Sequence, residues 1–335
     1  MSELSEPRVE ILMATYCGEK YIRKQIDSII NQTYQNWKLL VRDDGSSDQT
    51  VAILNEYASK DPRISIMLNT SDVHGWQQNF QNLIMAASDD AEYYMFCDQD
   101  DIWHQEKIRI FVDQMGALRQ KYPDRILVLH ADMSLMNEKD ELTEESFHKI
   151  YPLALKHITD CFYSQRVYGC NMMFDSRCLK LTAQFLDGHV YRTISHDGLI
   201  MKVAAADGGI VHFLPQTTMS YRRDGGNATA NHQFKTNKSK ILNKLKNLEK
   251  LASDQCPAYR QSIFVINKML ESDYPYAERE TLCKIKTSLE KGGFPLWKVW
   301  REIDVDCGSR VHTLSHFFVL FTKMHKKYLG RDSVQ

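Results

Sequence analysis

The sequence of 335 residues lacks long apolar runs and lacks paired cysteine motifs. No stretch approaches the roughly 20 apolar residues that a membrane-spanning helix requires. Residues 1–7 lack the basic and apolar regions of a secretory signal, so a cytoplasmic protein is expected. The eight cysteines include no Cys-x-x-Cys pair and lie mostly among apolar residues. This pattern predicts reduced, buried thiols rather than disulfides or a zinc site.

The sequence also has little net charge and lacks three common motifs. The formal net charge is −1, so the composition gives no argument for nucleic acid as a partner. No Gly-x-Gly-x-x-Gly follows the first expected strand, which disfavours a dinucleotide site, and the phosphate-binding Gly-x-x-x-x-Gly-Lys-Ser/Thr loop is absent. A Gly-x-Ser-x-Gly nucleophile elbow is missing as well.

Apolar runs of strand length alternate with amphipathic segments of helical period in the first two thirds of the chain. This alternation predicts an α/β fold with a largely parallel central sheet and helices on both faces. Beyond about residue 227 the strand signals stop, which predicts a catalytic domain at residues 1–230 and a helical region at 231–335. The strands are expected at residues 8–14, 37–41, 63–68, 92–97, 125–130, 167–174, 209–214 and 217–222, and the helices at 19–32, 49–59, 75–87, 105–121, 177–186 and 195–206.

Polar residues follow three of the expected strands, at residues 15–18, 43–48 and 98–101. In parallel sheets, ligands bind outside the carboxyl ends of the strands, so these three segments are expected along one edge. Carboxylates at Asp98, Asp100 and Asp101 repel one another unless a cation lies between them. Mg2+ prefers a few carboxylates together with phosphate oxygens of a substrate. The same residues also fit an acidic turn that caps the following helix.

Three segments carry a family resemblance: ILMATY at residues 11–16, LVRDDGSSD at 40–48 and CDQDD at 97–101. In order and spacing they resemble the family 2 glycosyltransferases of GT-A fold, over about residues 8–225. The form DQDDIW, with Ser-His-Asp downstream, is most similar to bacterial rhamnosyltransferases that build cell-wall, capsular or O-antigen polysaccharide. The resemblance implies inverting transfer of L-rhamnose from dTDP-rhamnose, or of a hexose from a UDP-hexose, to a lipid-linked or polysaccharide acceptor.

The resemblance also implies where the nucleotide-sugar donor binds. Asp43 or Asp44 would hydrogen-bond the pyrimidine base, while Thr15 and Tyr16 would pack on the nucleoside. From the residues alone, the Asp-Asp-Gly-Ser segment also fits a plain turn followed by a helix cap.

The resemblance further implies the catalytic groups. Asp98 and Asp100 would hold Mg2+ or Mn2+ against the donor diphosphate, with Asp98 counted among the donor contacts. Asp197 would be the base that takes the proton from the acceptor hydroxyl. An alternative is that Ser195 caps a helix and Asp197 only favours its positive end. His196 would tune the base or line the acceptor pocket.

Two more segments match the family. Gly169, Cys170 and Asn171 correspond to a segment that borders the acceptor pocket. Arg222 or Arg223 would supply positive charge to the donor phosphates.

Three functions remain open on the sequence. The first is the metal-dependent transferase. The second is a phosphohydrolase, because Asp-x-Asp after an apolar strand also describes an aspartyl-phosphate nucleophile, although that motif belongs on a first strand. The third is a non-catalytic nucleotide-sugar binder, which rests on Asp224 at a position where relatives often carry His.

The C-terminal region contains basic amphipathic segments. Residues 235–252 carry leucines at helical spacing among six lysines, and residues 311–324 have an aromatic side followed by further basic residues. Such helices lie on anionic membrane surfaces, or pack on the catalytic core or on a partner subunit of a homo-oligomer. A lipid-linked acceptor would favour contact with the inner face of the cell membrane.

Overall fold

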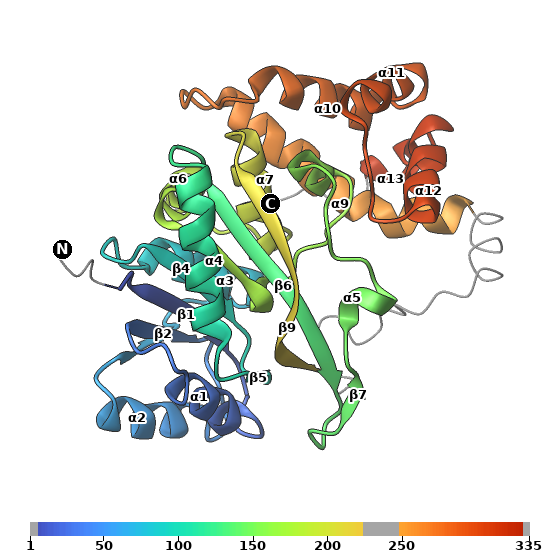
Figure 1. Cartoon of the computed structure of the whole chain (residues 1–335). Coiled ribbons are helices and arrows are strands. Elements are labelled where there is room, and N and C mark those ends of the chain that lie inside the picture. The colour runs from blue at the N-terminus through green and yellow to red at the C-terminus, as the bar shows by residue number, and fades with distance from the viewer. Residues whose placement is uncertain (1–5, 224–247, 331–335) are drawn as a thin grey trace.

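The computed structural model describes residues 6–223 and 248–330. Its described residues form a nine-stranded sheet in the order β3-β2-β1-β4-β8-β6-β9-β5, with β7 paired to β6 (Figure 1). The strands are β1 Val9–Thr15, β2 Trp37–Asp43, β3 Ile64–Leu68, β4 Tyr93–Cys97, β5 Ile102–Trp103, β6 Leu127–Met136, β7 Leu142–Glu144, β8 Met172–Asp175 and β9 Ile210–Arg222.

Strand β1 lies between β2 and β4, and all three are parallel. Thr15 at the end of β1 is opposite Asp43 at the end of β2, and Met13 is opposite Cys97 at the end of β4. The three polar segments that follow these strands therefore leave the sheet at the same edge. Beyond β4 the sheet is mixed, because β8 is antiparallel to both β4 and β6, whereas β9 is parallel to β6.

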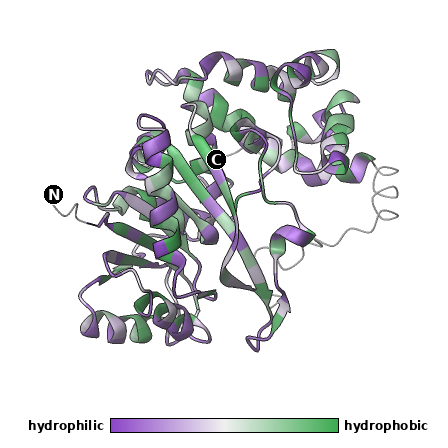
Figure 2. Cartoon of the chain, in the orientation of Figure 1, coloured by the Kyte–Doolittle hydropathy of each residue, from purple (hydrophilic) through white to green (hydrophobic). Residues whose placement is uncertain are grey.

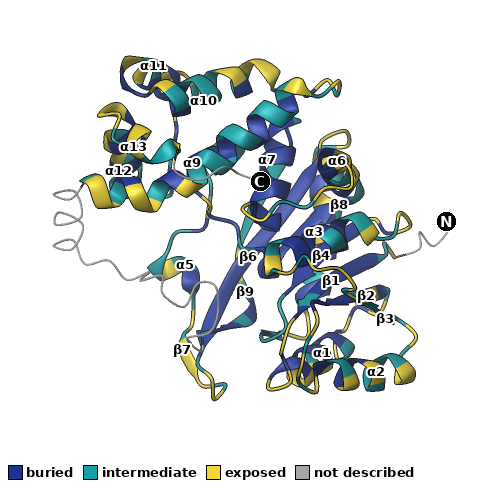
Figure 3. Ribbon diagram, turned by 180° about the vertical axis from the view of Figure 1, so that it is seen from behind, coloured by how far each residue is buried: buried dark blue, intermediate teal, exposed yellow. Residues whose placement is uncertain are grey.

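Helices cover both faces of the sheet, as the alternation of the sequence predicted (Figures 1 and 3). Leu12, Phe96 and Val128 belong to one hydrophobic core, whereas Ile11 and Met13 point to a second core on the other face. The first core includes residues of the helices α3 (Trp76–Ala86), α6 (Ser176–Leu186) and α7 (His196–Ala206). The second includes residues of α1 (Ile22–Ile30), α2 (Thr50–Lys60) and α4 (Lys107–Lys121). Apolar residues accordingly run along the central strands (Figure 2).

The helices of the first part of the chain are α1 Ile22–Ile30, α2 Thr50–Lys60, α3 Trp76–Ala86, α4 Lys107–Lys121, α5 Phe147–Ile150, α6 Ser176–Leu186 and α7 His196–Ala206. Short 3-10 helices at Ile158–Phe162 and Gly169–Asn171 are called η1 and η2. The C-terminal helices are α9 Leu248–Glu271, α10 Arg279–Lys291, α11 Gly293–Ile303, α12 Arg310–Phe321 and α13 Lys326–Leu329.

Three expected strands differ from the structure. The strand expected at residues 167–174 begins only at Met172, because the preceding Gly169–Asn171 forms the turn η2. The strands expected at 209–214 and 217–222 are one strand, β9, which pairs with β6 along its whole length. The register shifts between Ala131 and Asp132 of β6, and this irregularity accommodates Pro215, which cannot donate a ladder hydrogen bond.

The C-terminal helices pack on the α/β part of the chain. They share the first hydrophobic core with α3, α6 and α7. The Ser262 hydroxyl donates to the Phe162 carbonyl at 2.7 Å, and the hydroxyls of Tyr163 and Ser288 are 2.6 Å apart. The boundary expected near residue 230 and most of the helix expected at 235–252 lie outside the described residues. Among the helices that are described, none is long and apolar enough to cross a membrane. All eight cysteines are free, and six are buried.

Candidate donor and catalytic site

The turns after β1 and β4 are joined by one side chain, that of Gln99. Its Oε1 accepts a hydrogen bond from the Tyr16 amide at 2.9 Å, and its Nε2 donates to the Tyr16 carbonyl at 3.0 Å. A Cβ atom on Gly18 would lie only 2.3 Å from the same Oε1, so glycine is required for this contact. The Tyr16 side chain remains 58% exposed at this edge of the sheet. An aromatic ring is therefore presented beside a rigid pair of turns.

The Asp43 carboxylate is buried and fully used within the chain. Its Oδ1 accepts from the amides of Gly45 at 3.1 Å and Ser46 at 2.8 Å. Its Oδ2 accepts from the hydroxyls of Thr15 at 3.0 Å and Ser46 at 2.5 Å. A carboxylate offers about four lone-pair sites, and these four bonds occupy them. Asp43 therefore holds the turn, and Thr15 supports it from below rather than facing outward.

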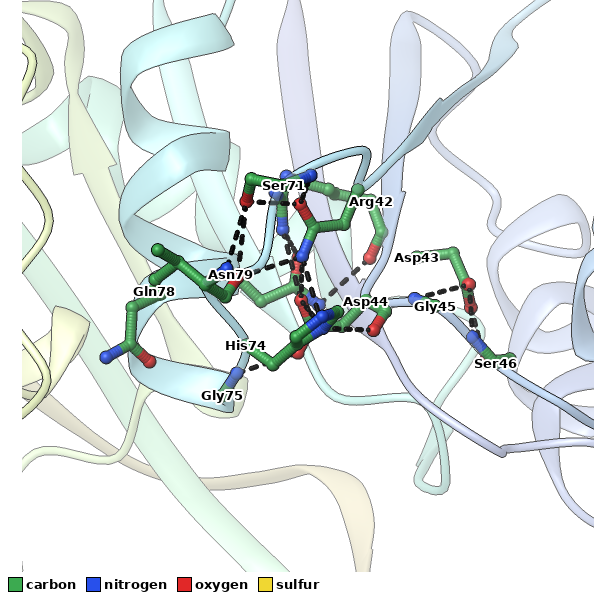
Figure 4. A network of polar contacts seen from close by, with 12 residues as sticks. Arg42, Asp43, Asp44, Gly45, Ser46, Ser71, His74, Gly75, Gln78 and Asn79 are labelled. Atoms are coloured by element: carbon green, nitrogen blue, oxygen red, sulfur yellow. Dashed lines mark hydrogen bonds and ion pairs between the residues drawn. The ribbon is translucent and has the colours of Figure 1, made fainter.

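The neighbouring Asp44 carboxylate lies in a different network (Figure 4). Its Oδ1 accepts from the Asn69 amide at 2.8 Å, and its Oδ2 accepts from the backbone N–H of Gly75 at 2.7 Å. The Arg42 guanidinium lies 3.5 Å from Oδ1 and is itself held by Asn79 at 2.8 Å. Each Asp44 oxygen accepts one hydrogen bond from these neighbours. Of the two aspartates, Asp44 therefore keeps more acceptor capacity for a ligand.

Three acidic or thiol side chains converge after β4. The carboxylate oxygens of Asp98 and Asp101 and the Sγ of Cys170 all lie within 4.8 Å of one another. Asp101 is 1% exposed; its Oδ1 accepts from the Arg222 amide at 2.9 Å, while its Oδ2 has no partner among the described residues. The charge of Asp100 acts on both of the other carboxylates. The expected pair Asp98 and Asp100 is therefore joined by Asp101 as a third, deeper carboxylate.

The crowding of these carboxylates raises their pKa values. Burial, together with the negative charges of Asp100 and Asp197, raises the pKa of Asp98 to about 7. Burial also raises the pKa of Asp101 well above its ordinary value, again with Asp100 and Asp98 contributing. The charge of Asp197 thus acts on Asp98 in the turn at residues 98–101, which we call the carboxylate turn. Such a cluster of buried acids is typical of a functional site.

The residues fit a hard divalent cation. Asp101 has an oxygen without a partner, and two or three carboxylates are the donor set that Mg2+ and Mn2+ accept beside phosphate oxygens. Burial raises the pKa of the Cys170 thiol well above its ordinary value, with Asp101 and Asp98 adding to the effect. A protonated thiol is not a thiolate ligand. The donor set is accordingly one of oxygens, which disfavours a soft metal.

A buried lysine lies beneath this cluster. The Lys107 side chain is fully buried, and its Nζ donates to the Cys170 carbonyl at 2.9 Å and lies 4.0 Å from the centre of the Trp103 ring. The pKa of Lys107 is lowered to about 8, because burial outweighs the nearby carboxylates of Asp101 and Asp98 that favour its charged form. Trp103 is 2% exposed and is a core aromatic rather than a sugar platform.

Asp197 lies in the first turn of α7. The Ser195 hydroxyl caps this helix by accepting from the Gly198 amide at 3.3 Å. The Asp197 Oδ1 accepts from the Gly198 amide at 2.6 Å, and its Oδ2 accepts from the Gly169 amide at 3.2 Å. The cap expected from the sequence is therefore present, and the carboxylate is also held by η2. These contacts fix the orientation of the carboxylate toward the Asp98 region.

His196 is enclosed by aromatic rings and lies away from water. It stacks on Phe80 with ring centroids 3.7 Å apart and meets the edge of Phe96 at 4.5 Å. Burial lowers its pKa to about 4, so the ring is neutral near pH 7. A Cβ atom on Gly169 would lie 2.3 Å from its Nε2. His196 thus packs against η2 and supports the segment that holds Asp197.

The remaining expected residues lie close by but are engaged in the chain. The Asn171 amide donates to the carbonyls of Ala131 and Asp132 at 2.9 Å each and accepts from Thr218 at 2.8 Å. The Arg222 side chain has 0% exposure, and the Arg223 amide donates to the Met136 carbonyl at 2.9 Å. Asp224 lies outside the described residues.

Gln99 and Lys107 both matter for the site, but neither was among the site residues expected from the sequence. The spacing of Lys107 from Phe111 and Met115 places it on the buried face of α4, and this signal was readable. Gln99 lies between two aspartates in a turn, and no local pattern shows that its amide bonds a backbone 83 residues away.

Comparisons with known proteins agree with this geometry. The family model described as Glycosyl transferase family 2 matches residues 10–185, more than half of the chain. The dTDP-rhamnosyl transferase RfbG of Shigella flexneri is 37% identical over 103 residues, which cover 30% of this chain and 36% of that protein. The UDP-Glc:alpha-D-GlcNAc-diphosphoundecaprenol beta-1,3-glucosyltransferase WfgD of Escherichia coli is 36% identical over 107 residues, covering 32% of this chain and 40% of that protein. The chain thus spans well under two thirds of either relative.

The fold is shared with a solved structure. A crystal structure of S. aureus TarS 1-349 in complex with UDP-GlcNAc superposes with a TM-score of 0.54, at 13% identity, over 96% of this chain and 91% of that one. The expected GT-A fold and the expected family are confirmed, and the family match decides against the phosphohydrolase alternative. This chain belongs to glycosyltransferase family 2.

Proposed function

We propose that the protein transfers a glycosyl group from a nucleotide-diphosphate sugar to an acceptor hydroxyl, with inversion at the anomeric carbon. The observation that carries the proposal is the meeting of Asp98 and Asp101 at the strand edge, within reach of the charge of Asp197. A carboxylate cluster for the diphosphate and a separate carboxylate for the proton are the two parts that such a transfer requires.

The donor nucleoside lies over the turns after β1 and β2. The exposed ring of Tyr16 packs on the nucleoside, and Asp44 accepts a hydrogen bond from the N–H of a pyrimidine ring. Asp43 and Thr15 support this contact by holding the turn through four internal hydrogen bonds. The Asn69 and Gly75 contacts fix the Asp44 carboxylate, so that little ordering is required when the base binds.

The carboxylates of Asp98, Asp100 and Asp101 would hold Mg2+ or Mn2+ at the carboxylate turn. When bound, the ion would supply positive charge to the diphosphate and to the negative charge that develops on the leaving group. Gln99 keeps this carboxylate turn in register with the nucleoside turn, because it bonds the Tyr16 backbone at both its N–H and its carbonyl.

Asp197 takes the proton from the acceptor hydroxyl. The acceptor oxygen forms its bond to the anomeric carbon as the bond from that carbon to the diphosphate oxygen breaks. The nucleoside diphosphate leaves with the electron pair, and the proton stays on Asp197. The Gly169 amide and the neutral His196 beneath it keep the carboxylate in place.

The donor is L-rhamnose carried by dTDP, and the acceptor is a lipid-linked glycan on the pathway to a surface polysaccharide. The similarity to dTDP-rhamnosyl transferase RfbG supports this donor. A UDP-hexose is the second candidate, supported by the similarity to the UDP-Glc-dependent WfgD. The name of that relative, a GlcNAc-diphosphoundecaprenol glucosyltransferase, also supports a diphosphoundecaprenol-linked acceptor. Both candidates use a pyrimidine nucleotide and the same site.

The test is a donor screen followed by a transfer assay. Purified protein with MnCl2 should be stabilised against heating by dTDP-rhamnose or by one UDP-hexose, because ligands that bind the native state raise its apparent stability. Transfer to synthetic lipid-diphosphate-linked N-acetylglucosamine is then followed by mass spectrometry. Asp197→Asn should lower kcat by about 10²–10⁴-fold while donor binding persists.

Two results would count against the proposal. The first is full transfer by Asp197→Asn, which would remove the base assignment. The second is donor binding without transfer to any of a panel of lipid-linked and soluble glycans, which would favour the non-catalytic binder. Asp113→Asn on the exposed face of α4 is the matched control for both, since its carboxylate lies 4.0 Å from Arg109 at the surface.

A further inference from the structure

Large exposed apolar side chains gather on two neighbouring helices of the C-terminal region. Nine such side chains are exposed in the described residues, and five of them lie on α11 and α12. Isolated exposed apolar residues are ordinary on soluble proteins, but a concentration on adjacent helices indicates an interaction surface. The five are Phe294 (70% exposed), Trp297 (37%), Leu314 (49%), Phe318 (42%) and Phe321 (41%).

The two helices place these side chains on one continuous surface. Trp300 of α11 packs on Phe317 of α12 with ring centroids 5.5 Å apart. Phe317 in turn stacks on Phe321 at 5.2 Å, and Phe294 stacks on Trp297 at 5.3 Å. We call this set of exposed and linking rings on α11 and α12 the aromatic surface.

The ends of the two helices also meet. A Cβ atom on Gly293, at the start of α11, would lie 2.9 Å from the Lys323 Cε and 3.9 Å from the Phe321 carbonyl. Phe294 follows Gly293 directly, so it lies near the end of α12 that carries Phe321. The helices therefore run antiparallel here, and their exposed rings reach the same end of the molecule.

The surrounding charges are mostly positive. Within residues 291–330, seven basic side chains are exposed but only two acidic ones, Glu302 and Asp304. Both acids already have partners, because Glu302 lies 2.5 Å from Lys284 and Asp304 pairs with Lys156. The exposed basic residues are Lys291, Lys298, Arg301, Arg310, Lys323, Lys326 and Lys327.

We infer that the aromatic surface docks on an anionic lipid bilayer. The tryptophan ring prefers the headgroup level, where its apolar body and its N–H are both accommodated, and phenylalanine and leucine bury apolar area at the boundary of the acyl chains. Lysine and arginine near them gain from the negative potential of anionic headgroups. Arg301 lies 4.8 Å from the Trp297 ring centre, so one cation and one ring are already held together for such a contact.

The charge decides between a bilayer and a second copy of this chain. In a two-fold dimer the same patch meets itself, so the basic side chains of the two copies would face each other. Like charges across an interface are unfavourable, whereas an anionic bilayer complements them. The contact is peripheral, since no helix among residues 6–223 and 248–330 is able to span a membrane.

This inference does not rest on the proposed function. The aromatic surface contains no residue of the donor and catalytic site, and α11 and α12 lie at the opposite end of the molecule from α1 and α2 (Figures 1 and 3). If the acceptor is lipid-linked, the surface would hold the enzyme where that acceptor is found. If the acceptor is soluble, vesicle binding is still expected.

The test is flotation of the full chain with vesicles of phosphatidylcholine alone or with about 30% phosphatidylglycerol. Binding to the anionic vesicles should be at least about tenfold stronger and should weaken as NaCl is raised, because salt screens surface charge. The double variant Phe294→Ser/Phe321→Ser should lower binding by about tenfold. In the triple variant Lys298→Gln/Lys323→Gln/Lys326→Gln, each substitution should lower vesicle binding by about fivefold.

Control variants distinguish binding through the aromatic surface from non-specific hydrophobic binding. Leu68→Ser and Leu142→Ser remove equally exposed apolar side chains elsewhere, 55% and 59% exposed, and should leave binding unchanged. Quenching of tryptophan fluorescence by spin-labelled lipid should be lost selectively in Trp297→Phe. Circular dichroism confirms that each variant is folded.

Three outcomes would overturn the inference. One is equal or absent binding to both kinds of vesicle. Another is a double aromatic variant that binds like the unaltered chain. The third is a dimer in solution, by light scattering, that Phe294→Ser/Phe321→Ser converts to monomer, which would assign the surface to a second copy of the chain.

Discussion

The backbone amide of Arg222 donates a hydrogen bond to the Oδ1 of Asp101 at 2.9 Å. The Arg222 Nε donates to the Asp100 carbonyl at 2.6 Å, and its guanidinium reaches Asp140 at 2.6 Å and the Asn137 carbonyl at 2.9 Å. The end of β9 thus fastens the carboxylate turn to the β6–β7 hairpin. In this arrangement Arg222 positions the carboxylate turn, whereas the sequence resemblance implied a role on the donor phosphates.

Arg222→Met should therefore loosen the carboxylate turn. The change leaves the Asp100 and Asn137 carbonyls and the Asp140 carboxylate without their buried donor, and we expect a loss of about 2–4 kcal/mol in the free energy of unfolding. Mn2+ affinity should fall with it, because the turn that carries the ligands is less ordered. Urea unfolding and Mn2+ titration measure the two effects.

Arg23→Met is the matched control for this change. The Arg23 side chain is 48% exposed and pairs with Glu56 at the surface, so its loss should leave the free energy of unfolding nearly unchanged. If Arg222→Met keeps its stability and its Mn2+ affinity but raises only the donor KM, Arg222 contacts the diphosphate after all.

The carboxylate turn should make metal binding depend on pH. The pKa of Asp98 is raised by burial from 3.8 to about 7, so its ionised form is disfavoured in the folded protein. Its stabilising contribution is complete below 3.8 and is lost as the pH rises through about 7. A divalent cation reverses this loss, because it binds the ionised form. The gain in Tm on adding MnCl2 should therefore be small near pH 5.5 and large near pH 8.

Variants of the carboxylate turn show which residues cause the pH dependence of the MnCl2 response. Asp98→Asn should reduce the pH-dependent part of the MnCl2 response to the part that Asp101 contributes, and Asp113→Asn should preserve the full response. Asp100→Asn and Asp101→Asn distinguish the ligand set, since the variant with the larger loss of Mn2+ affinity identifies the closer ligand. A response to MnCl2 that is the same at every pH would refute the assignment of the ion to these carboxylates.

The features that can be predicted from the sequence depend on contacts between residues close together in the chain. The features that cannot be predicted depend on contacts between residues far apart in the chain. Asp43 and Asp98 were placed at strand ends from local pattern alone, because an apolar run that stops at a carboxylate marks a strand leaving the core. The turn at Gly169 was expected as strand, since its shape depends on Lys107, Asp197 and β6, which are distant in sequence. The sequence pattern predicted two strands on either side of Pro215, whereas the structure has the single strand β9, because the continuity of that strand depends on its pairing with β6.

Single substitutions of Asp43 and Asp44 should have different effects, the first on stability and the second on nucleotide affinity. Asp43→Asn places an amide N–H₂ against donors that now bind a carboxylate, so we expect a loss of about 2–4 kcal/mol in unfolding free energy. Donor affinity of the folded fraction should change little. Asp44→Asn should instead weaken the binding of UDP and dTDP by about tenfold, because the base loses a charged acceptor. Calorimetric titration with both nucleotides, beside urea unfolding, gives the two quantities. Equal losses of nucleotide affinity in both variants would contradict the division of roles.

Gly169→Ala should damage the site through His196. The added Cβ would lie 2.3 Å from the His196 Nε2, and the ring has little room to move because it is stacked on Phe80 and bounded by Phe96. Overpacking of this kind costs about 1–3 kcal/mol, and it should displace the Gly169 amide that holds Asp197. We expect kcat to fall while the donor KM is kept, because the donor contacts lie on other turns.

The double variant Gly169→Ala/His196→Ala tests the cause of that loss. Removing the ring gives the new methyl group room, so the double variant should be more stable than the sum of the single changes predicts, by about 1–2 kcal/mol. Gly116→Ala is the control, because a Cβ there meets nothing within 4 Å. Strict additivity of the two changes would show that His196 is not what excludes a side chain at position 169, and the support of Asp197 by His196 would then have to be abandoned.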